Sequence, residues 1–237
     1  MKNSRQKNRE KQVEDDFNSM KSNVSAEDVS QSRKDLLALI FIIGLMLSGV
    51  LYIFIQLIHP RETIDVVKTN LWIMVAILTM IMSLLNAAGF ITLYVREHKY
   101  FKGLGKASFI LLVSFWLLSA IFSFNEAFVL PLVEDTSRDY VIGMMGLFDH
   151  VSVPVSLGIF PVLTNAAGIL YVLGGLGFGL SLSKSVHYSK FATLLFAFAS
   201  FATIAASVVP HPYNRIFAFP MGIALIALGC NSLKMYK

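Results

Sequence analysis

Residues 71–95 read LWIMVAILTMIMSLLNAAGFITLYV, a run of 25 residues without a charged side chain. A helix needs about 20 predominantly apolar residues to cross the roughly 30 Å hydrocarbon core of a bilayer. Every backbone amide in that core must be paired within its own segment, so an isolated run of this kind forms a helix there. The stretch therefore predicts a transmembrane helix.

Five further apolar runs flank this one, and a single charged residue, Glu126, interrupts them. The six predicted spans cover residues 36–58, 71–95, 107–133, 155–183, 191–209 and 216–233. We expect an all-α fold, a polytopic bundle of six transmembrane helices. Region 139–161, which contains Pro154 and Pro161, leaves three alternatives open: an outer amphipathic helix, a re-entrant segment, or the start of a kinked fourth span.

The composition of the chain agrees with this architecture. Of the 237 residues, 55% are hydrophobic and 15% are charged, and the mean hydropathy is +0.64. An ordinary soluble domain carries about 25% charged residues. This composition excludes a soluble globule and a long disordered protein, and the single cysteine, Cys230, excludes a disulfide scaffold.

The first 35 residues differ from the rest, because they carry eight Lys and Arg and seven Asp and Glu. Such a segment buries too little apolar area to offset its ordering entropy, so it is predicted to be a mobile cytosolic tail. Ser25, followed by Glu27 and Asp28, is typical of a helix start. A short helix is expected from there into the first span.

The positions of Lys and Arg predict the orientation of the bundle. With the N-terminus inside, 16 of the 20 fall in the tail, the loops 96–106 and 184–190, and the C-terminal residues 234–237. The four on the outside are Arg61, Lys68, Arg138 and Arg215. Because cytoplasmic loops carry an excess of basic residues, we expect both termini in the cytoplasm of a cell-membrane protein. The net charge of +5 is thereby assigned to membrane orientation and not to a nucleic acid partner.

Glu126 is the first candidate for chemistry. A carboxylate in hydrocarbon is costly unless it is paired or protonated, so acids in spans usually face the bundle interior or water. Glu126 and the adjacent Asn125 could form a proton-responsive or cation-binding site. The structural alternative is a buried hydrogen-bonding acid, or one close enough to the outer interface to reach water.

Polar residues form two stripes on the second and third spans. Thr79, Ser83 and Asn86 on one helix, and Ser119, Ser123 and Glu126 on the other, recur at helical spacing. Counting about 1.5 Å per residue from the span ends predicts that Thr79 lies near Glu126 and Asn86 near Ser119. The stripes could be interhelical hydrogen bonds or a polar translocation path.

Small residues predict close packing between the later spans. Asn165 on the fourth span is expected near the depth of Glu126. On the same span Gly175 and Gly179 form a GxxxG pair, and on the fifth span Ala202 and Ala206 are four apart. Such residues let helix backbones approach closely, within one chain or in a homodimer.

The five histidines give no metal-site spacing. His59, His150 and His211, with Asp149, are expected on the outside, where three His and an acid could bind zinc if they converged. No HExxH or Ser/His/Asp pattern is recognisable. We therefore expect no cofactor, no metal and no catalytic residue.

Residues 124–132, FNEAFVLPL, together with the glycine-rich stretch 174–180, resemble a group of small bacterial membrane proteins of uncharacterised activity. The resemblance covers residues 105–233, and its marks are an EAFVxPxL-like third span, a GGLxFGL-like stretch and a short last span. It implies a bacterial cytoplasmic membrane and supplies no activity.

Three functions remain open from the sequence. The first is a non-enzymatic accessory or regulatory membrane subunit, with a membrane-protein partner or a second copy of the chain. The second is a small solute or proton-coupled transporter that uses Glu126. The third and most remote is an intramembrane metalloenzyme.

Overall fold

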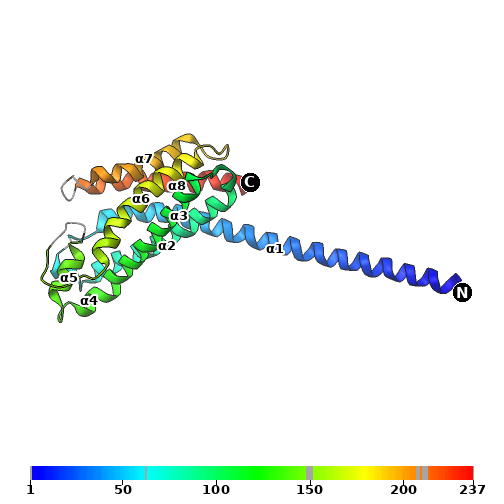
Figure 1. The fold of residues 1–237 in the computed structure, drawn as a ribbon, viewed down its shortest axis with the longest axis horizontal. Coiled ribbons are helices and arrows are strands. Elements are labelled where there is room, and N and C mark those ends of the chain that lie inside the picture. Colours follow the sequence, from blue (N-terminus) through cyan, green and yellow to red (C-terminus); the bar gives the residue numbers. More distant parts are fainter. Residues whose placement is uncertain (1, 62, 148–151, 207–208, 210–212, 237) are drawn as a thin grey trace. The chain divides into compact units, whose positions relative to one another are not determined.

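The computed structural model describes residues 2–61, 63–147, 152–206, 209 and 213–236, and in this part of the chain every regular element is helical (Figure 1). Five segments are long and apolar enough to cross a membrane. They are Val29–Ile58, Asn70–Tyr100, Leu104–Val133, Phe160–Leu182 and Arg215–Leu233. A sixth, shorter apolar helix covers Lys190–Ile204. The predicted all-α helical bundle is confirmed.

The chain divides into two units, residues 1–40 and residues 41–237. Helix α1 (Lys2–Ile58) passes through both. The helix therefore begins at Lys2 and not near Ser25, so the expected short helix was wrong in its starting point. The mobility of the first 35 residues stays a prediction.

Two antiparallel helices supply the predicted polar stripes. Helix α2 (Asn70–Glu97) begins at Thr69, whose side chain accepts the Trp72 backbone N–H at 3.3 Å and caps the helix. The next apolar run is one continuous rod of three parts: α3 (Leu104–Phe124), a π-helical turn η3 (Asn125–Val129) and α4 (Leu130–Val133). Short 3-10 turns at Ile64–Val66 (η1) and His98–Tyr100 (η2) flank α2.

Region 139–161 contains a separate short helix, α5 (Arg138–Met145). Residues 152–159 are not helical, and α6 (Phe160–Leu182) carries Pro161 in its first turn. The first turn tolerates proline because its N–H would lack a partner there anyway. The predicted start of the fourth span at residue 155 was therefore wrong by five residues.

The last two helices are α7 (Lys190–Ala206) and α8 (Ala218–Leu233). The 3-10 turn η4 (Tyr213–Phe217) leads into α8, and η5 (Lys234–Tyr236) follows it. Residues 207–208, at the end of the predicted fifth span, lie outside the described part.

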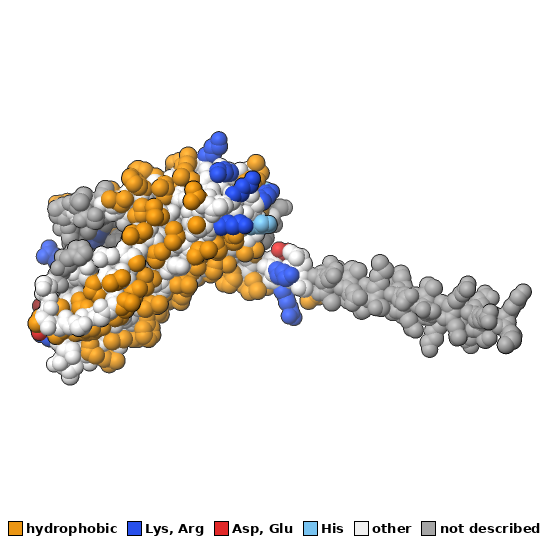
Figure 2. Space-filling model, viewed as in Figure 1, with side chains coloured by type: hydrophobic (Ala, Val, Ile, Leu, Met, Phe, Trp, Pro, Cys, Tyr) orange, Lys and Arg blue, Asp and Glu red, His pale blue; other side chains and the backbone are white. Residues whose placement is uncertain are grey.

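Aromatic side chains fill the centre of the bundle. The Phe90 ring lies 5.1 Å from both Phe178 and Phe196, which joins α2, α6 and α7. Large apolar side chains also cover the outside of the helices (Figure 2), and Ile121, Ile169 and Phe198 are more than half exposed. An apolar surface of this extent is unfavourable in water and suits a lipid environment.

Candidate functional site

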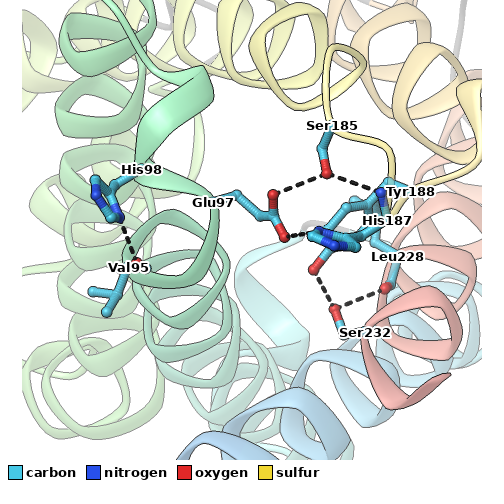
Figure 3. Close-up of polar contacts among 8 residues, drawn as sticks. All are labelled: Val95, Glu97, His98, Ser185, His187, Tyr188, Leu228 and Ser232. Carbon is cyan, nitrogen blue, oxygen red and sulfur yellow. Dashed lines mark hydrogen bonds and ion pairs between the residues drawn. The ribbon is translucent and has the colours of Figure 1, made fainter. Parts of the chain in front are cut away.

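The most deeply buried charged side chain among the described residues is Glu97, the last residue of α2, whose side chain is 2% exposed. Burying a carboxylate is costly unless hydrogen bonds satisfy its oxygens. Both oxygens have such partners here. Ser185 Oγ donates to Oε2 at 2.9 Å, and His187 Nδ1 lies 2.7 Å from Oε1 (Figure 3).

The loop that carries both partners connects α6 to α7. Within it, the His187 backbone N–H donates to Ser185 Oγ at 3.1 Å, so the two partners of Glu97 also hold each other. Ser185 is buried, whereas the His187 side chain is 41% exposed. When Nδ1–H of a neutral imidazole donates to a carboxylate, Nε2 is left as an acceptor. The arrangement therefore fixes a half-exposed imidazole on a buried carboxylate.

The same loop is tied to the last helix. Tyr188 OH and Ser232 Oγ lie 2.6 Å apart, and Ser232 also donates to the Leu228 carbonyl at 3.1 Å (Figure 3). Asn231 Oδ1 accepts the Ser189 backbone N–H at 3.1 Å. We call Glu97, Ser185, His187, Tyr188 and Ser232 the loop clamp. It joins the end of α2, the α6–α7 loop and α8.

Basic residues surround the loop clamp. At this end of the bundle segments 96–106 and 184–190, which include the adjoining helix ends, carry six Lys and Arg, and Lys234 follows α8. On the face seen in Figure 2, most Lys and Arg of the bundle gather at this end. Among the described residues no group of three or more His, Cys, Asp and Glu could hold a metal ion.

None of the five residues of the loop clamp is among the candidates predicted from sequence. The second span is predicted to end at Val95, and residues 96–106 to form a cytoplasmic loop. The available signal was that Glu97 is the single acid among the four bases of that segment.

The predicted Glu126 lies in the π-helical turn and is half-buried. In this turn the Leu130 N–H donates to the Asn125 carbonyl, five residues back, and not to the Glu126 carbonyl. The next N–H in π register would belong to residue 131, which is proline and has none. The Glu126 carbonyl instead accepts the indole N–H of Trp72 from α2, at 3.1 Å. Trp72 thus replaces the backbone bond that the turn gives up.

This bond gives a testable prediction. Replacing Trp72 with Phe should lower the free energy of unfolding by about 1–3 kcal/mol, because a buried carbonyl loses its donor. Pro131→Ala restores a backbone N–H at the π-register position, so it should recover part of that loss in the Trp72→Phe background. Thermal unfolding of the two single variants and the double variant measures the coupling. Strictly additive effects would contradict the assignment.

The polar stripes meet in a different register from the predicted one. Ser83 Oγ and Ser119 Oγ lie 2.9 Å apart, so the partner of Ser119 is Ser83 and not Asn86. Asn86 contacts α1 instead, where Ser48 Oγ lies 2.7 Å from its Oδ1. Thr79 donates to the Val75 carbonyl of its own helix at 2.9 Å.

The remaining predicted residues divide between the interior and the surface. Ser123 and Asn125 are buried. Asn165 is exposed on α6, and its predicted depth near that of Glu126 stays a prediction.

The small residues of α6 and α7 lie at a close contact. A side chain at Gly175 would collide with Ser200 Oγ, and a Cβ at Gly179 would lie 2.8 Å from the Thr193 carbonyl oxygen. Ala202 is buried, and the side chain of Ala206 is outside the described part. The contact is within one chain; homodimerisation through it stays a prediction.

At the opposite end of the bundle Lys68, Arg138 and Arg215 have acidic or carbonyl partners. Lys68 Nζ lies 2.9 Å from Glu134 and 2.5 Å from Asp135, and Arg138 lies 3.2 Å from Glu134. Arg215 donates to the His59 and Pro60 carbonyls just after α1, at 2.7 and 3.2 Å. Of the predicted outer metal ligands, His59 contacts the Pro60 carbonyl, and Asp149, His150 and His211 lie outside the described residues.

The Lys68–Asp135 pair gives a pH prediction. The hydrogen bond between Lys68 and Asp135 lowers the pKa of Asp135 below its ordinary value of 3.8. The same bond raises the pKa of Lys68 above its ordinary value of 10.5. The stabilisation by Asp135 is present above pH 4 and is lost as the pH falls through its lowered pKa. Asp135→Asn should therefore lower Tm slightly at pH 7, by an amount that shrinks toward pH 3. A constant difference across that range would contradict the pairing.

No protein-family model, curated protein or solved structure matches this chain. The resemblance to small bacterial membrane proteins accordingly stays a prediction.

Proposed function

We propose that this integral membrane protein has six membrane-spanning helices with both termini in the cytoplasm, and that it acts as a non-enzymatic accessory or regulatory subunit. The five long apolar helices and their apolar surface support the membrane location. Helix α7, with 17 residues, is about 26 Å long, which spans a bilayer that thins slightly around it.

The distribution of charge supports the orientation. Most Lys and Arg outside the tail lie at the clamp end, where Glu97 is the single acid of segments 96–106 and 184–190 and is buried. At the other end Lys68 and Arg138 are balanced by Glu134 and Asp135, and Arg215 is bound to carbonyls. An excess of unbalanced basic residues is the usual mark of the cytoplasmic side.

The loop clamp supports the proposal that the protein binds a partner in the membrane. The buried Glu97 carboxylate, with both oxygens satisfied, joins α2 to the α6–α7 loop at the cytoplasmic end, and the Tyr188–Ser232 bond joins that loop to α8. A fixed, basic end without a metal-binding group in its described residues suits recognition of another membrane protein or a second copy of the chain.

The orientation and the contact can be tested with single cysteines in a Cys230→Ser background. A membrane-impermeant maleimide added to intact cells should label Ser137→Cys and leave Lys102→Cys unlabelled. A bifunctional thiol crosslinker should then give one product of defined mass from position 102 and none from position 137. Labelling of position 102 from outside would overturn the orientation, and the absence of any product would overturn the contact role.

A transporter is the second candidate, and the π-helical turn favours it, because such turns are frequent at functional sites in membrane helices. The open cavity of about 450 Å³ beside α5 is lined by Val133, residues 136–140 and Val155, and it does not include Glu126. Proteoliposomes containing the purified chain decide between the candidates. Solute-dependent flux that Glu126→Gln abolishes and the exposed control Asp65→Asn preserves would establish transport, and no flux with either would remove it.

A further inference from the structure

Two buried polar groups near the middle of the bundle lack hydrogen-bond partners among the described residues. They are the indole Nε1 of Trp116 on α3 and the Nδ2 of Asn86 on α2. Both residues are almost fully buried, at 1% and 0% exposure. Leaving such groups unpaired costs about 1–3 kcal/mol each, so native structures rarely do so.

The helix register places these two residues at the same depth. Ser83 on α2 and Ser119 on α3 are in direct contact at 2.9 Å, and the helices run antiparallel. Three residues onward on α2 is Asn86, and three residues back on α3 is Trp116. Steps of three keep each residue on the face that carries the serine.

Helix α1 brings the two groups together from a third side. Ser48 Oγ contacts Asn86, and one turn later the Tyr52 ring lies edge-on to the Trp116 ring with their centroids 6.2 Å apart. The Tyr52 hydroxyl is 3.3 Å from that of Tyr171 on α6. Four helices therefore contribute polar side chains to this part of the bundle.

The chemistry of these atoms selects the ligand. The indole of Trp116 only donates. Ser48 Oγ lies 2.7 Å from both the Leu45 carbonyl oxygen and Asn86 Oδ1, yet a hydroxyl has one hydrogen to give. The Asn86 amide therefore offers its second polar atom as a donor or as an acceptor, depending on which way the amide is turned. An anion would need hydrogen-bond donors on both sides, that is, from Trp116 and from the Asn86 amide. The first three predicted spans also contain no Lys or Arg to balance its charge.

We propose that Asn86 and Trp116 together bind an internal water molecule. A water molecule can accept the Trp116 N–H and can either accept from or donate to the Asn86 amide. Buried waters in proteins typically make two to four hydrogen bonds. The Tyr52 and Tyr171 rings both lie edge-on to the Trp116 ring. The site does not depend on the proposed function, and it extends the Ser83–Ser119 contact deeper between α2 and α3.

The chain has two tryptophans, and this allows a direct test on the full-length protein with 15N-labelled indoles in micelles. Trp72, bonded to the Glu126 carbonyl, is the internal control. The Trp116 indole proton should show magnetisation transfer from bound water, and the Trp72 proton should not. Asn86→Leu should abolish that transfer, whereas Ser48→Ala, which leaves the second polar atom of the amide in place, should preserve it.

The wild-type spectrum by itself can overturn the proposal. A Trp116 indole proton with no transfer from water, whether it resonates as free or as bonded to an organic acceptor, would exclude the site. Transfer that persists unchanged in a folded Asn86→Leu variant would show that Asn86 takes no part.

Discussion

Replacing Glu97 with Ala should destabilise the bundle by about 2–3 kcal/mol. The substitution leaves the buried Ser185 hydroxyl without its acceptor and removes a charge-assisted bond to His187. The full cost of breaking a buried ion pair is not expected, because His187 is 41% exposed and water can replace its partner. For a chain of this size the loss corresponds to a fall in Tm of about 4–12 °C.

The order of the variants distinguishes the loop clamp from a general surface effect. Glu97→Ala should cost most, Ser185→Ala less, and His187→Ala least, because exposure increases along that series. His98→Ala is the matched control, since the His98 ring is exposed and bonds only to the Val95 carbonyl one turn back. Equal losses from His98→Ala and Glu97→Ala would show that the loop clamp does not stabilise the bundle.

The α3–α6 contact predicts an effect of similar size for Gly174→Ala. A Cβ at Gly174 would lie 2.6 Å from the Leu112 backbone nitrogen and 2.9 Å from its Cα. These are backbone atoms of α3, so no side chain can rotate to make room and the helices must separate. We expect a loss of about 3 kcal/mol, at the upper end for inserting a methyl group into a packed interior.

Gly168, on the same helix, provides the control. No atom lies within 4 Å of a Cβ placed there, and the position is exposed. Gly168→Ala should therefore be neutral or stabilise α6 by up to about 1 kcal/mol, through the lower backbone entropy of the unfolded chain. Chemical unfolding of both variants in the same detergent gives the comparison. If Gly174→Ala were as stable as Gly168→Ala, the close approach of α3 and α6 would be wrong.

The positions of the helices could be predicted from sequence because hydrocarbon-length apolar runs leave the backbone one solution. The ends of the helices could be predicted less accurately. Pro161 was read as one of several features of an ambiguous region, whereas it marks the first turn of α6. The second span is predicted to end at Val95, because charged residues follow it. The helix instead continues to Glu97, whose side chain is buried.

The candidate site depended on details that composition does not carry. Glu97 and His187 are 90 residues apart, and only the packed fold brings them together. The predicted pairing of Asn86 with Ser119 missed by three residues on α2. Depth was counted from span ends at a uniform rise per residue, and that count included neither the true ends of the spans nor the π-helical turn.

The wide turn at Asn125–Val129 also sets the orientation of everything that follows it in the same rod. It accommodates one residue more than an α-helix of equal length, so the segment beyond is rotated by about 100° relative to a regular continuation. Removing a single residue there would turn Leu130 away from the buried cluster that contains Trp72, and Glu134 away from Lys68. The number of residues in this turn, more than the identity of any side chain, therefore decides which face each end of the rod presents to the helices and loops beside it.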